Sequence, residues 1–339
     1  MEKHKFTYEE EFKFEAGGSV TGLELVYHCS EGGYHGQKVI WICHALTANS
    51  DPSDWWPQLV GPGKLFDTDK YFVMCGNMLG SCYGSAGPVT VNPATGKTFF
   101  LDFPKTTVRD IVRTLEIMRI HAGVPQIDLM IGASIGGFQA IEYSVMYPDV
   151  IRHSVFIATL ERVTPWLTAF EESQRMALEA DPSFRACESL EGGKEALKCA
   201  RSIALISYRS EEGYNMKQYE ADDDVIFADR AASYQRYQGK KLADRFDAYS
   251  YWYLSYEIDS MNVGRGRGGV KAAMASIKAD VTVVSIDSDV IFPAHAMSDM
   301  ADMVPGADYH MITSPYGHDG FLLEVEQITE IMVPILERL

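Results

Sequence analysis

Blocks of apolar residues recur along this chain, separated by polar loops and by stretches with helical periodicity. Continuous apolar runs are typical of strands buried on both faces of a parallel sheet, and they cover residues 39–43, 71–75, 129–131, 155–158 and 281–286. Residues 309–312 give a final strand, whereas residues 107–121, 138–146 and 321–336 have the periodicity of helices. Alternating strands and helices with right-handed crossovers predict an α/β fold with a mostly parallel, doubly wound sheet.

Two parts of the chain depart from this alternation. Near the start, residues 12–27 alternate apolar and polar positions around a Gly-Gly pair, which predicts a β-hairpin. Further on, residues 160–276 are charged, helical in character and rich in tyrosine, and they contain no strand of comparable apolarity. We therefore predict a core domain formed by residues 1–159 and 277–339, with residues 160–276 inserted as a helical lid.

A serine lies on the sharpest predicted turn of the chain. It stands in the pattern Gly132-x-Ser134-x-Gly136, between an apolar strand and a helix. Small flanking residues let strand and helix approach closely, and the turn raises the serine hydroxyl above the sheet. This context predicts a nucleophile, and the alternative is a glycine-rich turn with an ordinary helix-capping serine.

A serine nucleophile needs a base to take its proton and an acid to hold that base. His318 is the predicted base because, among nine histidines, it alone lies in a loop after a strand and after a candidate acid. The predicted acid is Asp289, which lies further into its turn than Asp287, a candidate for capping that turn. The order serine, aspartate, histidine is that of α/β-hydrolases. The alternative for His318 is an exposed loop histidine without a catalytic role.

Two backbone amides are predicted to hold the oxyanion that forms during attack. One belongs to Ile135, at the helix N-terminus after the serine, and the other to Leu46, in the loop after an early strand. His44 opens that loop and is interpreted as structural. Residues 80–88 form a glycine-rich loop that lacks Gly-Lys-Ser/Thr, so a phosphate-binding loop is rejected.

Charge and cysteine content narrow the class of protein. The 339 residues carry a formal net charge of -17, which argues against nucleic acid as a partner. The 6 cysteines show no metal-ligand spacing and are interpreted as reduced thiols, so no metal is predicted. The acidic N-terminal segment does not resemble a signal peptide, and no stretch is long and apolar enough for a membrane span. We expect a cytoplasmic protein without a membrane partner.

Several segments beyond the serine turn resemble the homoserine O-acetyltransferase family of the α/β-hydrolases. They cover nearly the whole chain and comprise residues 44–47, 61–64, 67–73, 77–85, 92–97, 103–104, 109–110, 245–248, 264–269 and 314–319. The resemblance implies an α/β-hydrolase fold and a ping-pong acyl transfer. Ser134 would take the acyl group from an acyl-CoA, most simply acetyl-CoA, and pass it to the hydroxyl of an amino acid. No tightly bound cofactor is implied.

The resemblance also implies how the acceptor is bound. Asp319 corresponds to the family's partner for the acceptor ammonium, and Arg209 to its partner for the carboxylate, through a bidentate fork that lysine does not offer. The alternatives are a turn-capping role for Asp319 and a salt bridge within the lid for Arg209. A homodimer formed through the lid helices is implied as well.

Departures from the family pattern leave the two substrates open. Ile135 stands where the family usually has methionine, Ser81 replaces a glycine and Val290 replaces an arginine, and residues 220–224 are unusually acidic. Homoserine O-acetylation is the first hypothesis. Serine as acceptor, succinyl-CoA as donor, and an esterase that uses water instead are the alternatives. The complete set of Ser134, Asp289 and His318 argues against an inactive homologue.

Overall fold

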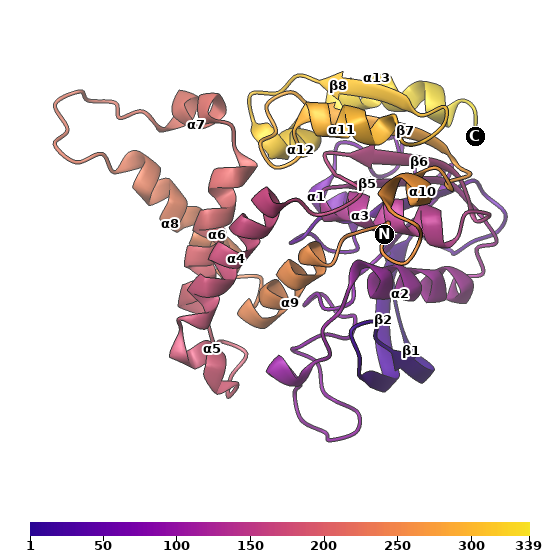
Figure 1. Ribbon diagram of the computed structural model, residues 1–339, viewed down its shortest axis with the longest axis horizontal. Coiled ribbons are helices and arrows are strands. Elements are labelled where there is room, and N and C mark those ends of the chain that lie inside the picture. The colour runs from indigo at the N-terminus through magenta and orange to yellow at the C-terminus, as the bar shows by residue number, and fades with distance from the viewer.

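An eight-stranded sheet forms the centre of the computed structural model, which describes residues 1–339 (Figure 1). The strand order is β1-β2-β4-β3-β5-β6-β7-β8, and every neighbouring pair from β4 to β8 is parallel. The bounds are β1 Glu2–Lys13, β2 Ser19–Cys29, β3 Val39–Cys43, β4 Phe72–Gly76, β5 Ile127–Ala133, β6 Ile151–Ile157, β7 Asp280–Ile286 and β8 Asp308–Ile312. The predicted mostly parallel α/β sheet is confirmed.

The predicted hairpin is longer than its apolar pattern indicated. β1 and β2 pair antiparallel from Lys13↔Ser19 to Glu2↔Cys29, with a register shift between Tyr8 and Glu11. β1 is an edge strand, and most of its side chains are exposed, but the half-buried His4, Phe6 and Tyr8 alternate with exposed residues. The first half of β1, which lies before the predicted range, therefore has both the backbone pairing and the alternating burial of a strand.

The sheet is buried on both faces, as the continuous apolar runs predicted. In β3, Trp41 belongs to one apolar cluster, whereas Ile40 and Ile42 belong to a second. The first cluster includes residues of α2 (Val108–His121), α3 (Ile135–Met146) and α11 (Ala294–Ala301), and the second includes residues of α13 (Val325–Leu336). A strand of this kind has no solvent face, which explains why it shows no alternation.

The chain end differs from the prediction in one respect. A single helix was expected over residues 321–336, but the structure has α12 (Gly320–Leu323) and α13, separated at Glu324. Glu324 has φ -87° and ψ 57°, which lies outside the helical region and interrupts the hydrogen-bond pattern. The prediction of one continuous helix is therefore wrong.

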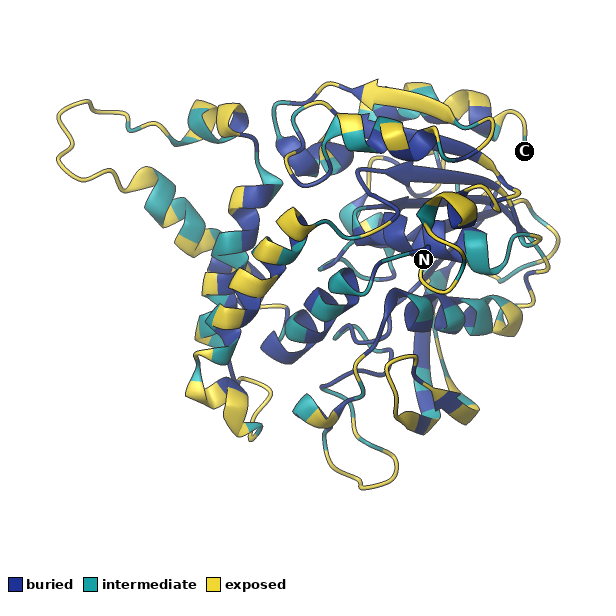
Figure 2. Ribbon diagram, viewed as in Figure 1, coloured by how far each residue is buried: buried dark blue, intermediate teal, exposed yellow.

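Helices without any strand occupy the chain between β6 and β7. They are α4 (Pro165–Glu179), α5 (Pro182–Ala186), α6 (Lys194–Tyr208), α7 (Glu211–Gln218), α8 (Arg230–Ala243), α9 (Ala248–Asp259) and α10 (Val270–Met274). α4 to α8 stand to one side of the sheet, and the connection from α7 to α8 extends away from the body (Figure 1). α9 is mostly buried, whereas that connection is exposed (Figure 2). The action of this insertion as a lid stays a prediction.

Candidate active site

Ser134 has a strained backbone at the junction of β5 and α3. Its φ of 59° and ψ of -129° are values that residues with a side chain seldom adopt. The surroundings hold it there, because its N–H donates to Ile157 O at 3.1 Å and the Thr159 hydroxyl donates to Ser134 O at 2.9 Å. The Ser134 side chain makes no capping hydrogen bond to α3, so the alternative of an ordinary helix cap is wrong.

The glycines around Ser134 are sterically required. A Cβ added to Gly132 would lie 2.1 Å from Gly136 O, and one added to Gly136 would lie 2.3 Å from Cys43 O. Real Cβ atoms do not approach backbone atoms so closely, so strand, turn and helix can pack in this way only with glycine at both positions. The structure thus accounts for the Gly-x-Ser-x-Gly pattern by packing.

His318 and Asp289 form a buried hydrogen-bonded pair. His318 Nδ1 lies 2.7 Å from Asp289 Oδ2, and the other oxygen, Oδ1, accepts from the N–H groups of Ile291 at 2.8 Å and Phe292 at 3.1 Å. His318 is only 4% exposed, so it is not a solvent-exposed loop histidine. With Nδ1–H donated to the carboxylate, the Nε2 lone pair is the one available to accept a proton.

Asp287 has a different role from Asp289. Its Oδ1 accepts from the Ser314 N–H at 3.0 Å and so ties the loop after β7 to the loop after β8. Asp287 does not cap its own turn as predicted, because it is Asp289 that accepts from the N–H groups of that turn. β5, β7 and β8 are parallel members of one sheet, so their carboxyl ends bring the loops of Ser134, Asp289 and His318 to the same edge.

Aromatic rings surround His318, and two nearby carboxylates raise its pKa. Its ring centroid lies 5.4 Å from that of Phe292, 5.5 Å from that of Phe321 and 5.9 Å from that of Tyr208. Burial by itself lowers the pKa of His318, but the Asp289 carboxylate, with a smaller contribution from Asp319, raises that pKa above 6.5 overall. Sequence reasoning missed Tyr208. Its position next to Arg209 was the only signal that could have revealed it.

The loop proposed for the oxyanion amides is held from inside by His44. The N–H of Met78 donates to His44 Nε2 at 3.0 Å, and Nδ1 faces Ala45 O at 3.0 Å, so Nδ1 carries the proton. Burial lowers the pKa of His44 to about 4, which keeps the ring neutral. The structural interpretation of His44 is confirmed.

Both predicted oxyanion amides are available as donors. The N–H of Leu46 has no acceptor within the protein. Ile135 is the first residue of α3, where backbone N–H groups have no partner within the helix. Their role in holding an oxyanion stays a prediction.

Arg209 and Asp319 lie against each other. Arg209 Nη1 is 2.5 Å from Asp319 Oδ2, and the two side chains are 21% and 16% exposed. Asp319 does not cap α12, so the turn-capping alternative is not supported. The ion pair of Arg209 joins the insertion to the core, so it is not the predicted alternative of a salt bridge within the lid. Because Asp319 follows His318, this ion pair places two opposite charges beside the predicted base.

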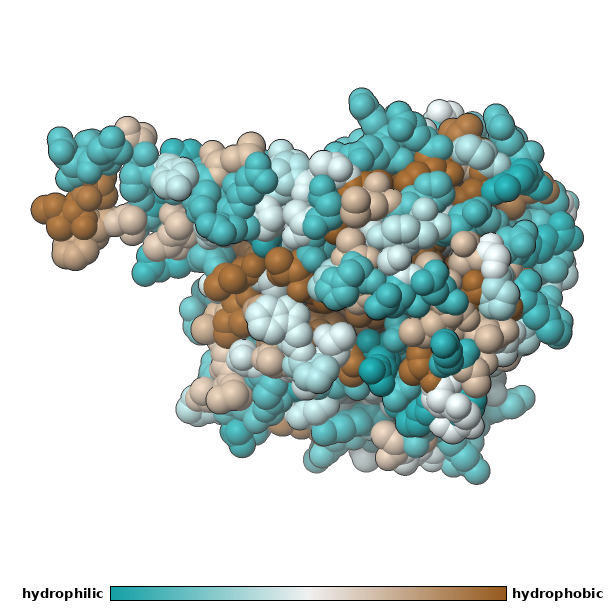
Figure 3. Space-filling view, turned by 45° about the horizontal axis from the view of Figure 1, so that its top comes forward, coloured by the Kyte–Doolittle hydropathy of each residue, from teal (hydrophilic) through white to brown (hydrophobic).

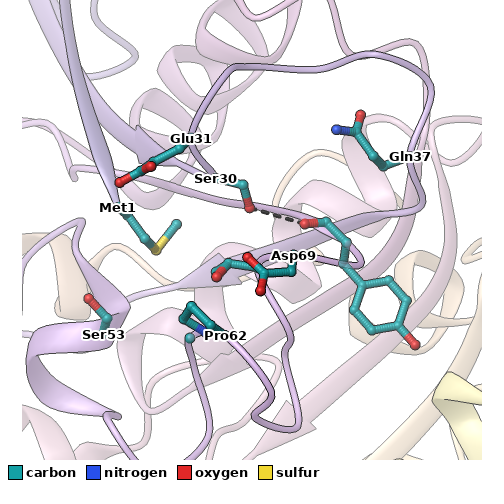
Figure 4. Close-up of a pocket in the computed structure, with 10 residues that line it drawn as sticks. Met1, Ser30, Glu31, Gln37, Ser53, Pro62 and Asp69 are labelled. Atoms are coloured by element: carbon teal, nitrogen blue, oxygen red, sulfur yellow. Dashed lines mark hydrogen bonds between the residues drawn. The ribbon is translucent and has the colours of Figure 1, made fainter.

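Elsewhere the structure contains a polar pocket unrelated to these residues. It has a volume of about 420 Å³ and is lined by the side chains in Figure 4, among them Ser30, Glu31 and Asp69. None of the predicted site residues lines it. The 6 cysteines are free thiols, and no group of three or more His, Cys, Asp or Glu side chains is arranged to hold a metal ion.

Comparison with known proteins assigns the family. Residues 38–325 match the family described as alpha/beta hydrolase fold. A homoserine O-acetyltransferase of Cyclobacterium marinum is 40% identical over 337 residues, which cover 98% of this chain and 94% of that protein. The chain belongs to the homoserine O-acetyltransferase family. As a member of the homoserine O-acetyltransferase family, it is an acyltransferase with an α/β-hydrolase fold, which confirms the resemblance found in the sequence.

Solved structures share the whole fold. The homoserine O-acetyltransferase of Bacillus anthracis matches with a TM-score of 0.90 at 22% identity, over 99% of this chain and 97% of that one. An esterase matches with a TM-score of 0.88 at 21% identity, over 99% of each chain. At these identities the two structures show only a common fold. None of the helices combines the length and the apolar character that a membrane span requires.

Proposed function

We propose that this acyltransferase moves an acetyl group from acetyl-CoA to the hydroxyl of L-homoserine, through an acetyl-serine intermediate on Ser134. The observation that carries the proposal is the combination of a strained serine, a buried His–Asp pair and an adjacent ion pair of opposite charges. The first two supply acyl transfer, and the third supplies recognition of a zwitterion. Homoserine O-acetyltransferases are also the relatives that this chain matches over 98% of its length.

In the first half-reaction, Ser134 Oγ attacks the thioester carbonyl carbon while His318 Nε2 takes the hydroxyl proton. The amides of Leu46 and Ile135 donate to the oxyanion. When the tetrahedral intermediate collapses, the carbon–sulfur bond breaks and His318 returns the proton to the sulfur, so CoA leaves as a thiol. Asp289 stabilises the imidazolium that exists between the two proton transfers.

In the second half-reaction the acceptor hydroxyl takes the place of CoA. His318 removes its proton as its oxygen attacks the acetyl-serine carbonyl, and Ser134 leaves with that proton. The O-acetyl amino acid and the free serine are the products. Water in the acceptor's place would give hydrolysis, which is the esterase alternative.

The Arg209–Asp319 pair suits an amino acid better than water or a simple alcohol. An acceptor carboxylate can bind the Arg209 fork while its ammonium binds Asp319, so each protein charge exchanges its present partner for one on the substrate. This exchange leaves no buried charge unpaired at either stage. It therefore favours transfer to an amino acid over hydrolysis.

Release of free CoA thiol tests the function. Purified protein with acetyl-CoA and L-homoserine should release CoA, and Ser134→Ala should abolish the release. Succinyl-CoA and L-serine, tested in parallel, identify donor and acceptor. Equal CoA release with and without an amino acid would support the esterase alternative instead.

The proposal includes a homodimer formed through the lid in the cytoplasm, where the free thiols remain reduced. The connection from α7 to α8 carries Ile226 and Phe227, which are 86% and 85% exposed, and Figure 3 shows apolar side chains at its outer tip. Residues 220–224 before this tip are acidic, whereas α8 carries four basic residues and no acidic one. In a dimer, the acidic segment of one copy can face the basic helix α8 of the other. Light scattering of the wild type and of Phe227→Glu tests this, with a dimer expected only for the wild type.

A further inference from the structure

Two carbonyl groups next to Leu46, in the loop after β3 that offers a predicted oxyanion amide, accept hydrogen bonds that hold them in place. Gln139 Nε2 donates to His44 O at 3.1 Å, and the N–H of Ala48 donates to Ala45 O at 3.0 Å. The second bond closes a turn with Leu46 and Thr47 at its centre. Anchored carbonyls matter here because the amide of Leu46 must be aimed before an oxyanion forms.

Arg245 anchors this loop from the inserted helical segment. Its Nη1 donates to Thr47 O at 2.6 Å and to Tyr83 Oη at 2.6 Å, and its Nη2 lies 3.4 Å from Thr47 Oγ1. Arg245 lies between α8 and α9, 198 residues from Thr47 in the sequence. The contact therefore joins the insertion directly to the loop of the predicted oxyanion hole.

Peptide planarity carries the effect of this contact to Leu46. A trans peptide holds its C=O and N–H antiparallel in one plane, so fixing one fixes the direction of the other. Arg245 fixes Thr47 O and with it the Ala48 N–H of the same peptide. That N–H donates to Ala45 O, whose own peptide ends in the N–H of Leu46. Two rigid planes thus connect the guanidinium to the oxyanion donor.

We propose that Arg245 is a positioning residue for the oxyanion hole, acting through Thr47 and Ala48 on the amide of Leu46. This inference rests on the proposed acyl transfer at Ser134. It gives the inserted helices a part in the rate of the chemical step, separate from substrate recognition by Arg209.

The test compares Arg245→Ala with the wild type in the acylation of Ser134 by p-nitrophenyl acetate, which needs neither CoA nor an amino acid. His44 still holds Ala45 O in the variant, so we expect acylation to slow about 10-fold, less than the 10²–10³-fold typical when an oxyanion donor is lost. Trifluoroacetone, which forms a tetrahedral anion on the serine, should bind about 10-fold more weakly, while CoA binding stays unchanged. Weaker binding of trifluoroacetone with unchanged binding of CoA distinguishes a change in the orientation of the Leu46 amide from a general structural effect.

Two variants serve as controls, with circular dichroism to verify folding. Tyr83→Phe removes one acceptor of the guanidinium but leaves Thr47 O bound, so it should acylate at the wild-type rate. Arg245→Lys keeps the charge without the fork and should fall between wild type and Arg245→Ala. The inference would be overturned if Arg245→Ala were acylated as fast as the wild type. It would also be overturned if the substitution weakened the binding of CoA and of trifluoroacetone equally. Failure of the wild type to acylate would instead contradict the assignment of Ser134.

Discussion

The guanidinium of Arg209 is paired with the carboxylate of Asp319 at 2.5 Å. This ion pair joins the inserted helices to the loop that carries His318, the predicted base. Arg209 follows α6, whereas Asp319 follows His318. The pairing means that an acceptor amino acid enters a site whose charges are already balanced. Its carboxylate and ammonium must replace a contact that exists in the free protein.

Replacing Arg209 should impair acceptor binding more than chemistry. Arg209→Lys keeps a positive charge but removes the bidentate fork, so KM for L-homoserine should rise about 10- to 100-fold, the range for one hydrogen bond to a charged group. Acylation by p-nitrophenyl acetate should stay within about 2-fold of the wild type, because it needs no acceptor. Steady-state kinetics with varied homoserine measures the first effect, and an equal loss in both assays would contradict it.

The two aspartates after β7 provide a matched pair of variants. Asp289→Asn should lower kcat by up to about 10⁴-fold, because an amide at this place favours the wrong imidazole tautomer. Asp287→Asn loses only the charge that accepts from the Ser314 N–H, so it should retain most of the activity and lower stability by about 1 kcal/mol. CoA release and urea unfolding measure the two effects, and a reversed ranking of the activities would reject Asp289 as the acid.

The pH dependence of kcat/KM should report on His318. The base must be neutral to take the Ser134 proton, and the Asp289 carboxylate raises the pKa of His318 above 6.5 despite burial. Activity should therefore rise with pH along a limb whose midpoint lies above 6.5. Asp319→Asn removes a second negative charge near the ring, so it should move that midpoint to lower pH. A midpoint that does not move would show that Asp319 has no influence on the base.

A buried carboxyl in α4 should make stability fall as the pH rises. Glu171 is 2% exposed, and burial raises its pKa from 4.5 to about 8. Between these values the folded protein keeps a proton that the unfolded chain releases. The free energy of unfolding should therefore decrease from pH 4.5 to 8, by at most about 1.4 kcal/mol per pH unit from this group.

Glu171→Gln should flatten this dependence, because an amide keeps the neutral shape at every pH. Glu172 is the matched control, since its side chain is 56% exposed and Glu172→Gln should leave the slope unchanged. Urea unfolding of the three proteins at pH 5 and pH 8 measures the difference. Parallel slopes for wild type and Glu171→Gln would show that Glu171 is not protonated in the fold.

The sequence pattern predicted strands that are buried on both faces of the sheet, and turns at which only glycine fits. β3 matches the apolar run over residues 39–43, and Thr107 caps α2 as the start of its periodicity indicated. Contacts between the inserted helices and the core left no such trace, whereas the pairing of Asp289 with His318 followed from their places after strands of one parallel sheet. The pairing of Arg209 with Asp319 and the hydrogen bond from Arg245 to Thr47 depend on where the inserted helices fold back, which local pattern does not record. The sequence pattern does not reveal the break at Glu324 either, because apolar residues continue on both sides of it.

The edge strand β1 has a consequence for how molecules meet in concentrated solution. Lysine and glutamate side chains are frequent along it, and its register shifts between Tyr8 and Glu11. Such an edge repels and misaligns an incoming strand. Continuous edge-to-edge pairing of sheets needs two receptive edges on every molecule. The opposite edge strand, β8, carries a single carboxylate, Asp308, and no lysine, so only that edge is receptive. Sheet-to-sheet contact would therefore stop at a closed pair of molecules and could not propagate into a fibre.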